Sequence, residues 1–201
     1  MKGRLLRGPA LVALGIALAA GGCSSDTGAP GSPDDAITAA RSAGEVSADA
    51  DAALGIEADV ASVTACLDAG TPTGEAATVA FTGDGSPGLA VIRVPAAAGP
   101  LRAGTGDAFG SCIHDALLHD IGEVGTEVSL DVTTQPGPAL GDASIEIHSR
   151  LHAGPFGLGD DIVLVAVGDL LVIARVSSQD TGDIDHAPIQ APLEAAVRAL
   201  G

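Results

Sequence analysis

Two almost wholly apolar segments near the C-terminal end constrain the fold of this 201-residue chain more than any other feature. They cover residues 162–167 and 170–176, and the dipeptide Gly168-Asp169 joins them. Gly-Asp suits the two-residue turn of a β-hairpin, and the valines and isoleucines of both segments favour strands. We therefore predict a hairpin here, at the centre of a β-sheet.

Four further segments have the character of strands. Residues 78–82 and 89–94 are short β-branched runs on either side of a loop rich in glycine. From residue 128 to 133, and again from 145 to 152, apolar and polar side chains alternate. Alternation with period two predicts strands with one buried face and one wet face.

Helical spacing of apolar residues predicts three helices, over residues 56–67, 107–119 and 188–200. Asp107 is suited to cap the second of these. Strands that follow one another without intervening helices are typical of an α+β fold. We expect a mostly antiparallel sheet of about five to six strands, with two to three helices packed on one face.

The N-terminus has the layout of an export signal. A basic start is followed by an uncharged apolar stretch, residues 10–20, which is too short to span a bilayer. Ala20-Gly21-Gly22-Cys23 resembles the bacterial lipobox, although Ala20 stands where Leu is usual. The resemblance implies cleavage after Gly22 and acylation of Cys23, which would anchor the protein to the outer face of the cell membrane. The alternative is a secreted protein in which Cys23 merely follows the cleavage site.

These features divide the chain into a signal peptide over residues 1–22, a flexible tether over residues 23–51 and one extracytoplasmic domain over residues 52–201. The tether is rich in Ser, Asp, Gly, Pro and Ala, with a short helix near residues 34–43. The residue usage, with abundant Ala, Gly, Asp, Val and Arg, is typical of an actinobacterial source. We expect a monomer.

If Cys23 is acylated, Cys66 and Cys112 remain as an even pair in an exported protein, which favours a disulfide. Each lies on the apolar side of its segment, so we expect the pair to be buried. Closing a loop of this length would stabilise the fold by roughly 3 to 4 kcal/mol. The alternatives are two free thiols or a redox dithiol, but no Cys-x-x-Cys spacing supports the latter.

The charge of the chain excludes some partners. The formal net charge is −17, and removing residues 1–22 takes away three basic residues and no acid, leaving −20. Such a surface repels phosphate, so we expect no nucleic-acid partner. It can serve solubility alone or include a dedicated cation-binding face. With only three aromatic residues, all Phe, sites that stack sugars or bases are also disfavoured.

The spacing of the histidines in the sequence does not predict a metal site. His114 and His119 accompany acids on the charged side of their predicted helix. His148 and His152 share a strand face but are about 13 Å apart, too far to hold one ion. We therefore assign these four histidines to the surface.

Other catalytic and cofactor patterns are also lacking. The glycine-rich residues 154–161 lack the Gly-Lys-Ser/Thr ending of a phosphate-binding loop. We interpret them as a strand connector with Asp160 and Asp161 exposed. Residues 180–185 do not match a calcium loop, and Ser111 has no recognisable activating partner. We predict no catalytic, cofactor-binding or metal-ligating residue, and no enzymatic activity.

The run from Gly159 to Val176, followed by a C-terminal helix, resembles the extracellular sensor-type domains of actinobacterial Ser/Thr kinases and of related lipoproteins. In element order the similarity covers roughly residues 60–200. Those kinase domains commonly hold two disulfides, whereas this chain has cysteines for one. The resemblance implies a non-catalytic module that binds an unidentified ligand or envelope protein. The alternative is a carrier of an apolar ligand or lipid.

Overall fold

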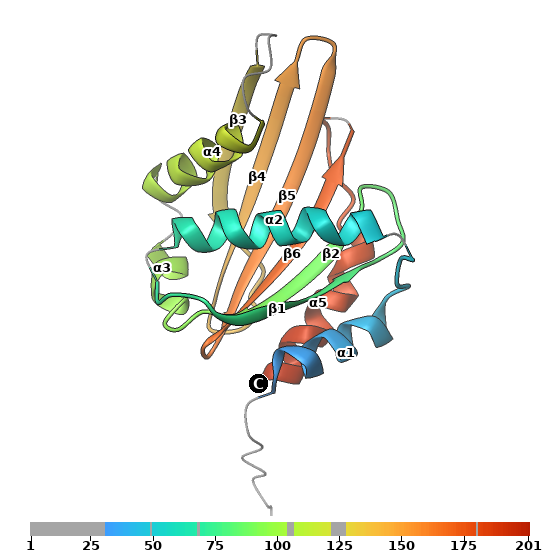
Figure 1. The fold of residues 1–201 in the computed structure, drawn as a ribbon, viewed down its shortest axis with the longest axis vertical. Coiled ribbons are helices and arrows are strands. Elements are labelled where there is room, and N and C mark those ends of the chain that lie inside the picture. Colours follow the sequence, from blue (N-terminus) through green and yellow to red (C-terminus); the bar gives the residue numbers. More distant parts are fainter. Residues whose placement is uncertain (1–30, 49, 68, 104–106, 122–127, 180) are drawn as a thin grey trace, which may run out of the picture.

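A single six-stranded antiparallel sheet organises the protein, and helices cover both of its faces (Figure 1). The computed structural model describes residues 31–48, 50–67, 69–103, 107–121, 128–179 and 181–201. In chain order the elements are α1 (Pro33–Ala43), α2 (Ala50–Cys66), β1 (Thr73–Ala80), β2 (Gly88–Arg93), α3 (Ala98–Ala103), α4 (Asp107–Ile121), β3 (Val128–Pro136), β4 (Ala143–Ala153), β5 (Phe156–Val167), β6 (Leu170–Ser178) and α5 (Ala187–Leu200).

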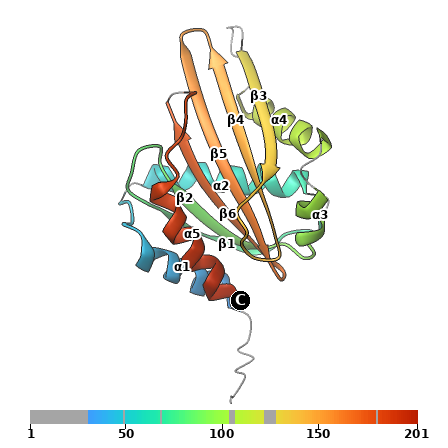
Figure 2. The same cartoon turned by 180° about the vertical axis from the view of Figure 1, so that it is seen from behind.

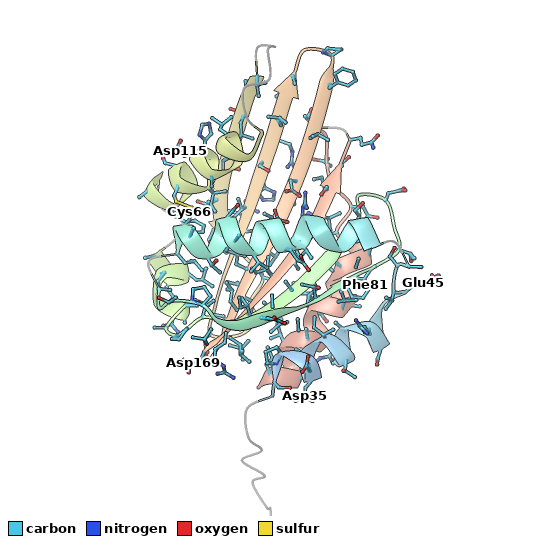
Figure 3. All side chains as sticks on the ribbon, viewed as in Figure 1. Asp35, Glu45, Cys66, Phe81, Asp115 and Asp169 are labelled. Atoms are coloured by element: carbon cyan, nitrogen blue, oxygen red, sulfur yellow. A yellow bond between two sulfur atoms is a disulfide. The ribbon has the colours of Figure 1, made fainter. Side chains whose placement is uncertain are left out.

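The strand order is β1-β2-β6-β5-β4-β3, so the predicted apolar hairpin does lie at the centre. Val167 pairs with Leu170 across the Gly168-Asp169 turn, where Gly168 has a φ of 56° that favours glycine. Figure 3 shows Asp169 at the tip of this hairpin. The α+β class, the antiparallel pairing and the strand number of the sequence prediction are confirmed.

The prediction that the helices pack on one face is wrong. Alternate residues of β5 belong to two separate cores, with Leu164 in one and Val165 in the other. Helices α2, α3 and α4 cover the Leu164 face, whereas α1 and α5 cover the Val165 face (Figure 2). Strands that are apolar at nearly every position need a cover on both sides, which explains the two layers of helices.

Helix α1 belongs to the folded domain. Ser32 and Asp35 form a capping box at its start, and Ala36, Ile37 and Ala40 are buried against α5. The small alanines allow the two helices to pack closely. The domain core therefore begins at Ala36 rather than at residue 52, and the predicted tether is shorter than residues 23–51 at its C-terminal end.

The disulfide between Cys66 and Cys112 is present, with a Cα–Cα distance of 5.6 Å. It joins the end of α2 to α4, and its yellow bond lies beside the Cys66 label in Figure 3. The expectation of a buried pair is wrong, because Cys66 is half-buried and Cys112 is exposed. The apolar residue that faces the core at this point of α4 is the next one, Ile113.

Candidate functional site

Asp160 and Asp161 occupy the middle of the molecule, where they point to opposite faces of β5. The expectation that they are exposed loop residues is wrong, because β5 already begins at Phe156 and only 15% and 4% of their side chains are exposed. Gly154 and Pro155 alone form the turn before β5. Each aspartate accepts hydrogen bonds from basic side chains on its own face, so each is the centre of a separate polar cluster.

The cluster around Asp161 lies on the α5 face and combines residues of β4 and α5. Nη1 of Arg150 lies 2.6 Å from Oδ1 of Asp161, and Nδ1 of His148 lies 2.9 Å from the same oxygen. Nε2 of His186 lies 2.8 Å from Oδ2. His186 immediately precedes α5 as its N-cap residue. This cluster therefore attaches the start of α5 to the centre of the sheet.

The hydrogen bonds outweigh the effect of burial at Asp161. Burial raises the pKa of this carboxyl, but hydrogen bonds from Arg150, His186 and His148 together hold the pKa below its ordinary value. Asp161 is therefore an ionised acceptor at neutral pH. It accepts a hydrogen bond from one ring N–H of each histidine. The other ring nitrogen of each histidine does not contact Asp161.

Glu146 lies where those other ring nitrogens point. Its Oε1 is 3.5 Å from Nδ1 of His186, and its Oε2 is 3.9 Å from Nε2 of His148. The side-chain amide of Gln135 donates to Oε2 at 2.9 Å. Only 15% of the Glu146 side chain is exposed. Two carboxylates thus enclose two imidazoles, and the carboxylate that Arg150 contacts is that of Asp161.

The second cluster attaches α2 to the other face. Nε of Arg175 lies 2.8 Å from Oδ1 of Asp160 and 3.1 Å from Oδ2 of Asp59 on α2. Ser177 also donates to Asp160, at 3.1 Å. Burial raises the pKa of Asp160, an effect that Arg175 opposes only in part. Arg175 thus joins a carboxylate of β5 to a carboxylate of α2 inside the fold.

A groove of about 560 Å³ opens beside the Asp161 cluster. Its walls come from the β3–β4 connection, from β4 and β5, and from α5, and it is open to solvent on one side. Most of the lining is apolar, including Val163, Ile189 and Leu193, and Glu146 and His186 reach it from the cluster. Figure 2 shows this face, where β3 and β4 run beyond the edge of α5. The size is typical of a site for a small organic ligand.

The sequence analysis found only part of this site. The alternation in β4 correctly placed His148 on one face with Glu146, but the interpretation of a wet surface histidine was wrong, because His148 is 24% exposed and bound to Asp161. His186 was missed because it comes from a loop, and no local pattern joins it to β4. The sequence could have indicated the site through the acids at 160 and 161, had the strand been extended back to them.

The remaining histidines are elsewhere. His152 is exposed at the far end of β4, and Nδ1 of His114 lies 3.3 Å from exposed Asp115 on α4. His119 lies in α4, but its side chain is outside the described set, as is the whole of Cys23. Within the described ranges, no three His, Cys, Asp or Glu side chains are arranged to hold a metal ion. No helix in those ranges is long and apolar enough to cross a membrane.

Comparison with known proteins adds no family. The sequence matches no known family model, and no curated protein matches it.

Proposed function

We propose that this protein is a cell-envelope lipoprotein, anchored through Cys23, whose domain is a non-catalytic binding module that takes a small ligand in the groove beside α5. The groove carries the proposal. It has the volume of a small-molecule site, a mostly apolar lining and a few converging polar groups from the Asp161 cluster. These are the features by which pockets bind an apolar body and orient a polar end.

The polar groups support binding rather than catalysis. Asp161 has three short contacts, one each with Arg150, His148 and His186, and two of them hold the imidazoles in position. The described lining residues of the groove include no Ser, Thr, Cys or Lys, and their ionisable side chains are those of Glu146, His186 and Glu194. The site therefore offers orientation and charge.

The open side of the groove bears on the alternative function. A carrier that shields a lipid from water is expected to enclose it between sheet and helices. Here the lining instead leaves one side of the volume in contact with solvent, and the cores on both faces are formed by closely packed buried side chains. This favours a ligand that is partly exposed when bound, as in a module that presents or senses it.

Native mass spectrometry of the full chain tests this proposal. The chain is produced in an actinobacterial host and released from the envelope in mild detergent, as the wild type and as two variants of α5. Gln190→Trp places a bulky ring in the groove, whereas Ala191→Trp adds the same ring to an adjacent exposed residue that does not line it. We expect a small-molecule adduct on the wild type and on Ala191→Trp, and its loss from Gln190→Trp.

An adduct that persists in Gln190→Trp, or a wild-type chain that carries none, contradicts the binding proposal. A bound species that the mass identifies as a diacyl lipid supports the carrier instead.

A further inference from the structure

The charge distribution in the groove is one-sided. Its lining among the described residues contains two carboxylates, Glu146 and Glu194, and no Lys or Arg. Arg150 is the nearest cation in the cluster, and its guanidinium contacts Asp161 and backbone carbonyls. The basic side chains that lie next to Glu146 are therefore the imidazoles of His148 and His186.

Hydrogen bonding by Asp161 determines which imidazole atoms face Glu146. Because an ionised carboxylate only accepts, Nδ1 of His148 and Nε2 of His186 must carry the protons that point to Asp161. In the neutral imidazole the opposite nitrogen has a lone pair. Those nitrogens are the ones that lie 3.9 and 3.5 Å from the Glu146 oxygens.

Glu146 is therefore a largely buried carboxylate that faces two lone pairs when both histidines are neutral. The amide of Gln135 satisfies one of its oxygens without supplying charge. A charge in a site of low polarity is stabilised by an opposite charge, and it attracts one more strongly than it would in bulk water. The cationic group of a ligand would supply that opposite charge.

From this arrangement we infer that the ligand of the groove is an organic cation, with an ammonium-type group held beside Glu146 and an apolar body along Val163, Ile189 and Leu193. This inference rests on the proposed function, since it names the chemical class of ligand for the same groove. The apolar lining contributes affinity, while Glu146 and Glu194 discriminate against anions.

Isothermal titration calorimetry with three probes of equal chain length tests the inference. These are octyltrimethylammonium below its micelle concentration, octanoate and 1-octanol, each added to the folded chain. We expect the cation to bind at least about tenfold more tightly than octanoate.

Glu146→Gln keeps the shape of the side chain and removes its charge, so it should weaken octyltrimethylammonium binding by about tenfold. Glu57→Gln changes the net charge equally at an exposed position of α2, on the other face, and should leave the affinity unchanged. If Glu146→Gln unfolds, Glu194→Gln at the half-buried edge of the groove serves instead, with a smaller loss expected.

Equal affinity for all three probes, or an equal effect of Glu146→Gln and Glu57→Gln, overturns the cation inference and leaves the groove as a site for an apolar ligand. Failure of every probe to bind also overturns it. The adduct measured by native mass spectrometry then decides separately whether the groove binds a ligand at all.

Discussion

Asp160 and Asp161 are neighbours in the chain, yet each organises a different face of the sheet. The pleat of β5 sends them in opposite directions, and each finds an arginine on an adjacent strand, Arg175 on β6 and Arg150 on β4. Their different environments shift their pKa values in opposite directions. The pKa of Asp161 is lowered by hydrogen bonds that exceed the effect of burial, whereas burial dominates at Asp160 and raises its pKa.

This difference predicts unequal effects of removing each charge. Asp161→Asn should lower the free energy of unfolding at pH 7 by about 2 to 4 kcal/mol, because it leaves Arg150 without its partner. Asp160→Asn should cost much less, since the ionised form of Asp160 is disfavoured by burial and Arg175 keeps Asp59 as a partner. Urea unfolding followed by circular dichroism measures both.

The pH dependence of these variants provides a second check. A lowered folded-state pKa means that ionised Asp161 contributes stability above the unfolded pKa of about 3.9, and that this contribution is lost as the pH falls through the folded-state value. The cost of Asp161→Asn should therefore shrink below about pH 4. Asp160 has the opposite sign, because its raised pKa makes the wild type gain stability as the pH falls through the folded-state value. Equal costs for the two variants at pH 7 and at about pH 3 would contradict this assignment.

At the scale of elements, the β3–β4 connection is held in place where the backbone of Gly141 packs closely against the carbonyl oxygen of Ala166 on β5. The φ of Gly141 is 60°, and a Cβ added there would collide with that carbonyl oxygen. Residues 136–140, immediately before it, line the groove. The tight packing of Gly141 is therefore one reason why this side of the groove has a defined shape.

Gly154 provides a matched control for this contact, because its φ is 59° and nothing lies within 4 Å of its would-be Cβ. Gly154→Ala should cost only the backbone strain of about 1 to 2 kcal/mol. Gly141→Ala should cost about 1 to 3 kcal/mol more, because the connection must also move. Thermal unfolding of the two variants measures the difference, and equal losses would show that the contact with Ala166 is unimportant.

The disulfide between α2 and α4 gives a further prediction. The double variant Cys66→Ala/Cys112→Ala should lose about 4 kcal/mol of unfolding free energy, because the bond closes a long loop of the unfolded chain, with a sequence separation of 46. Ser111→Ala, at the exposed residue beside Cys112, is the control and should change little. If the double variant is as stable as this control, the bond does not stabilise the fold.

The sequence predicted elements better than it predicted the contacts between them. The central hairpin, α4 and α5 were found because their apolar patterns are strong. The observed bounds of α4 and α5 differ from the expected ones by at most two residues, but β5 begins at Phe156, six residues before its expected start. Helix α3 was missed, since six residues containing a Gly and a Pro give no period. The contact of His186 with Asp161 spans 25 residues and depends on tertiary structure alone.

At the scale of the whole molecule, the position of α1 was the main error. A composition of Ser, Gly, Pro and Asp is typical of a tether, yet Ile37 and two alanines suffice to pack α1 on α5. The sequence of α1 by itself does not predict a second layer of helices, nor the groove that lies on that face of the sheet. It could have been inferred from the hairpin, because a strand that is apolar on both sides requires two covered faces.

The proposed anchor is a property of the whole protein and has its own test. Metabolic labelling with a clickable fatty acid should mark the wild-type chain and fail to mark Cys23→Ala, because acylation needs the thiol of this residue. Cys66 and Cys112 provide an internal comparison, since their disulfide leaves neither thiol free. Equal labelling of wild type and Cys23→Ala would contradict the lipoprotein proposal.

The most direct test of the central proposal, that the groove beside α5 is the ligand site, is methyl NMR of the folded chain. The chain is titrated with the compound that native mass spectrometry releases from it. We predict shifts of the methyl groups of Val163, Ile189 and Leu193, with Ile147 and Ile173 in the core on the opposite face unchanged. Shifts confined to Ile147 and Ile173, or none at the three groove residues, would contradict the proposed site.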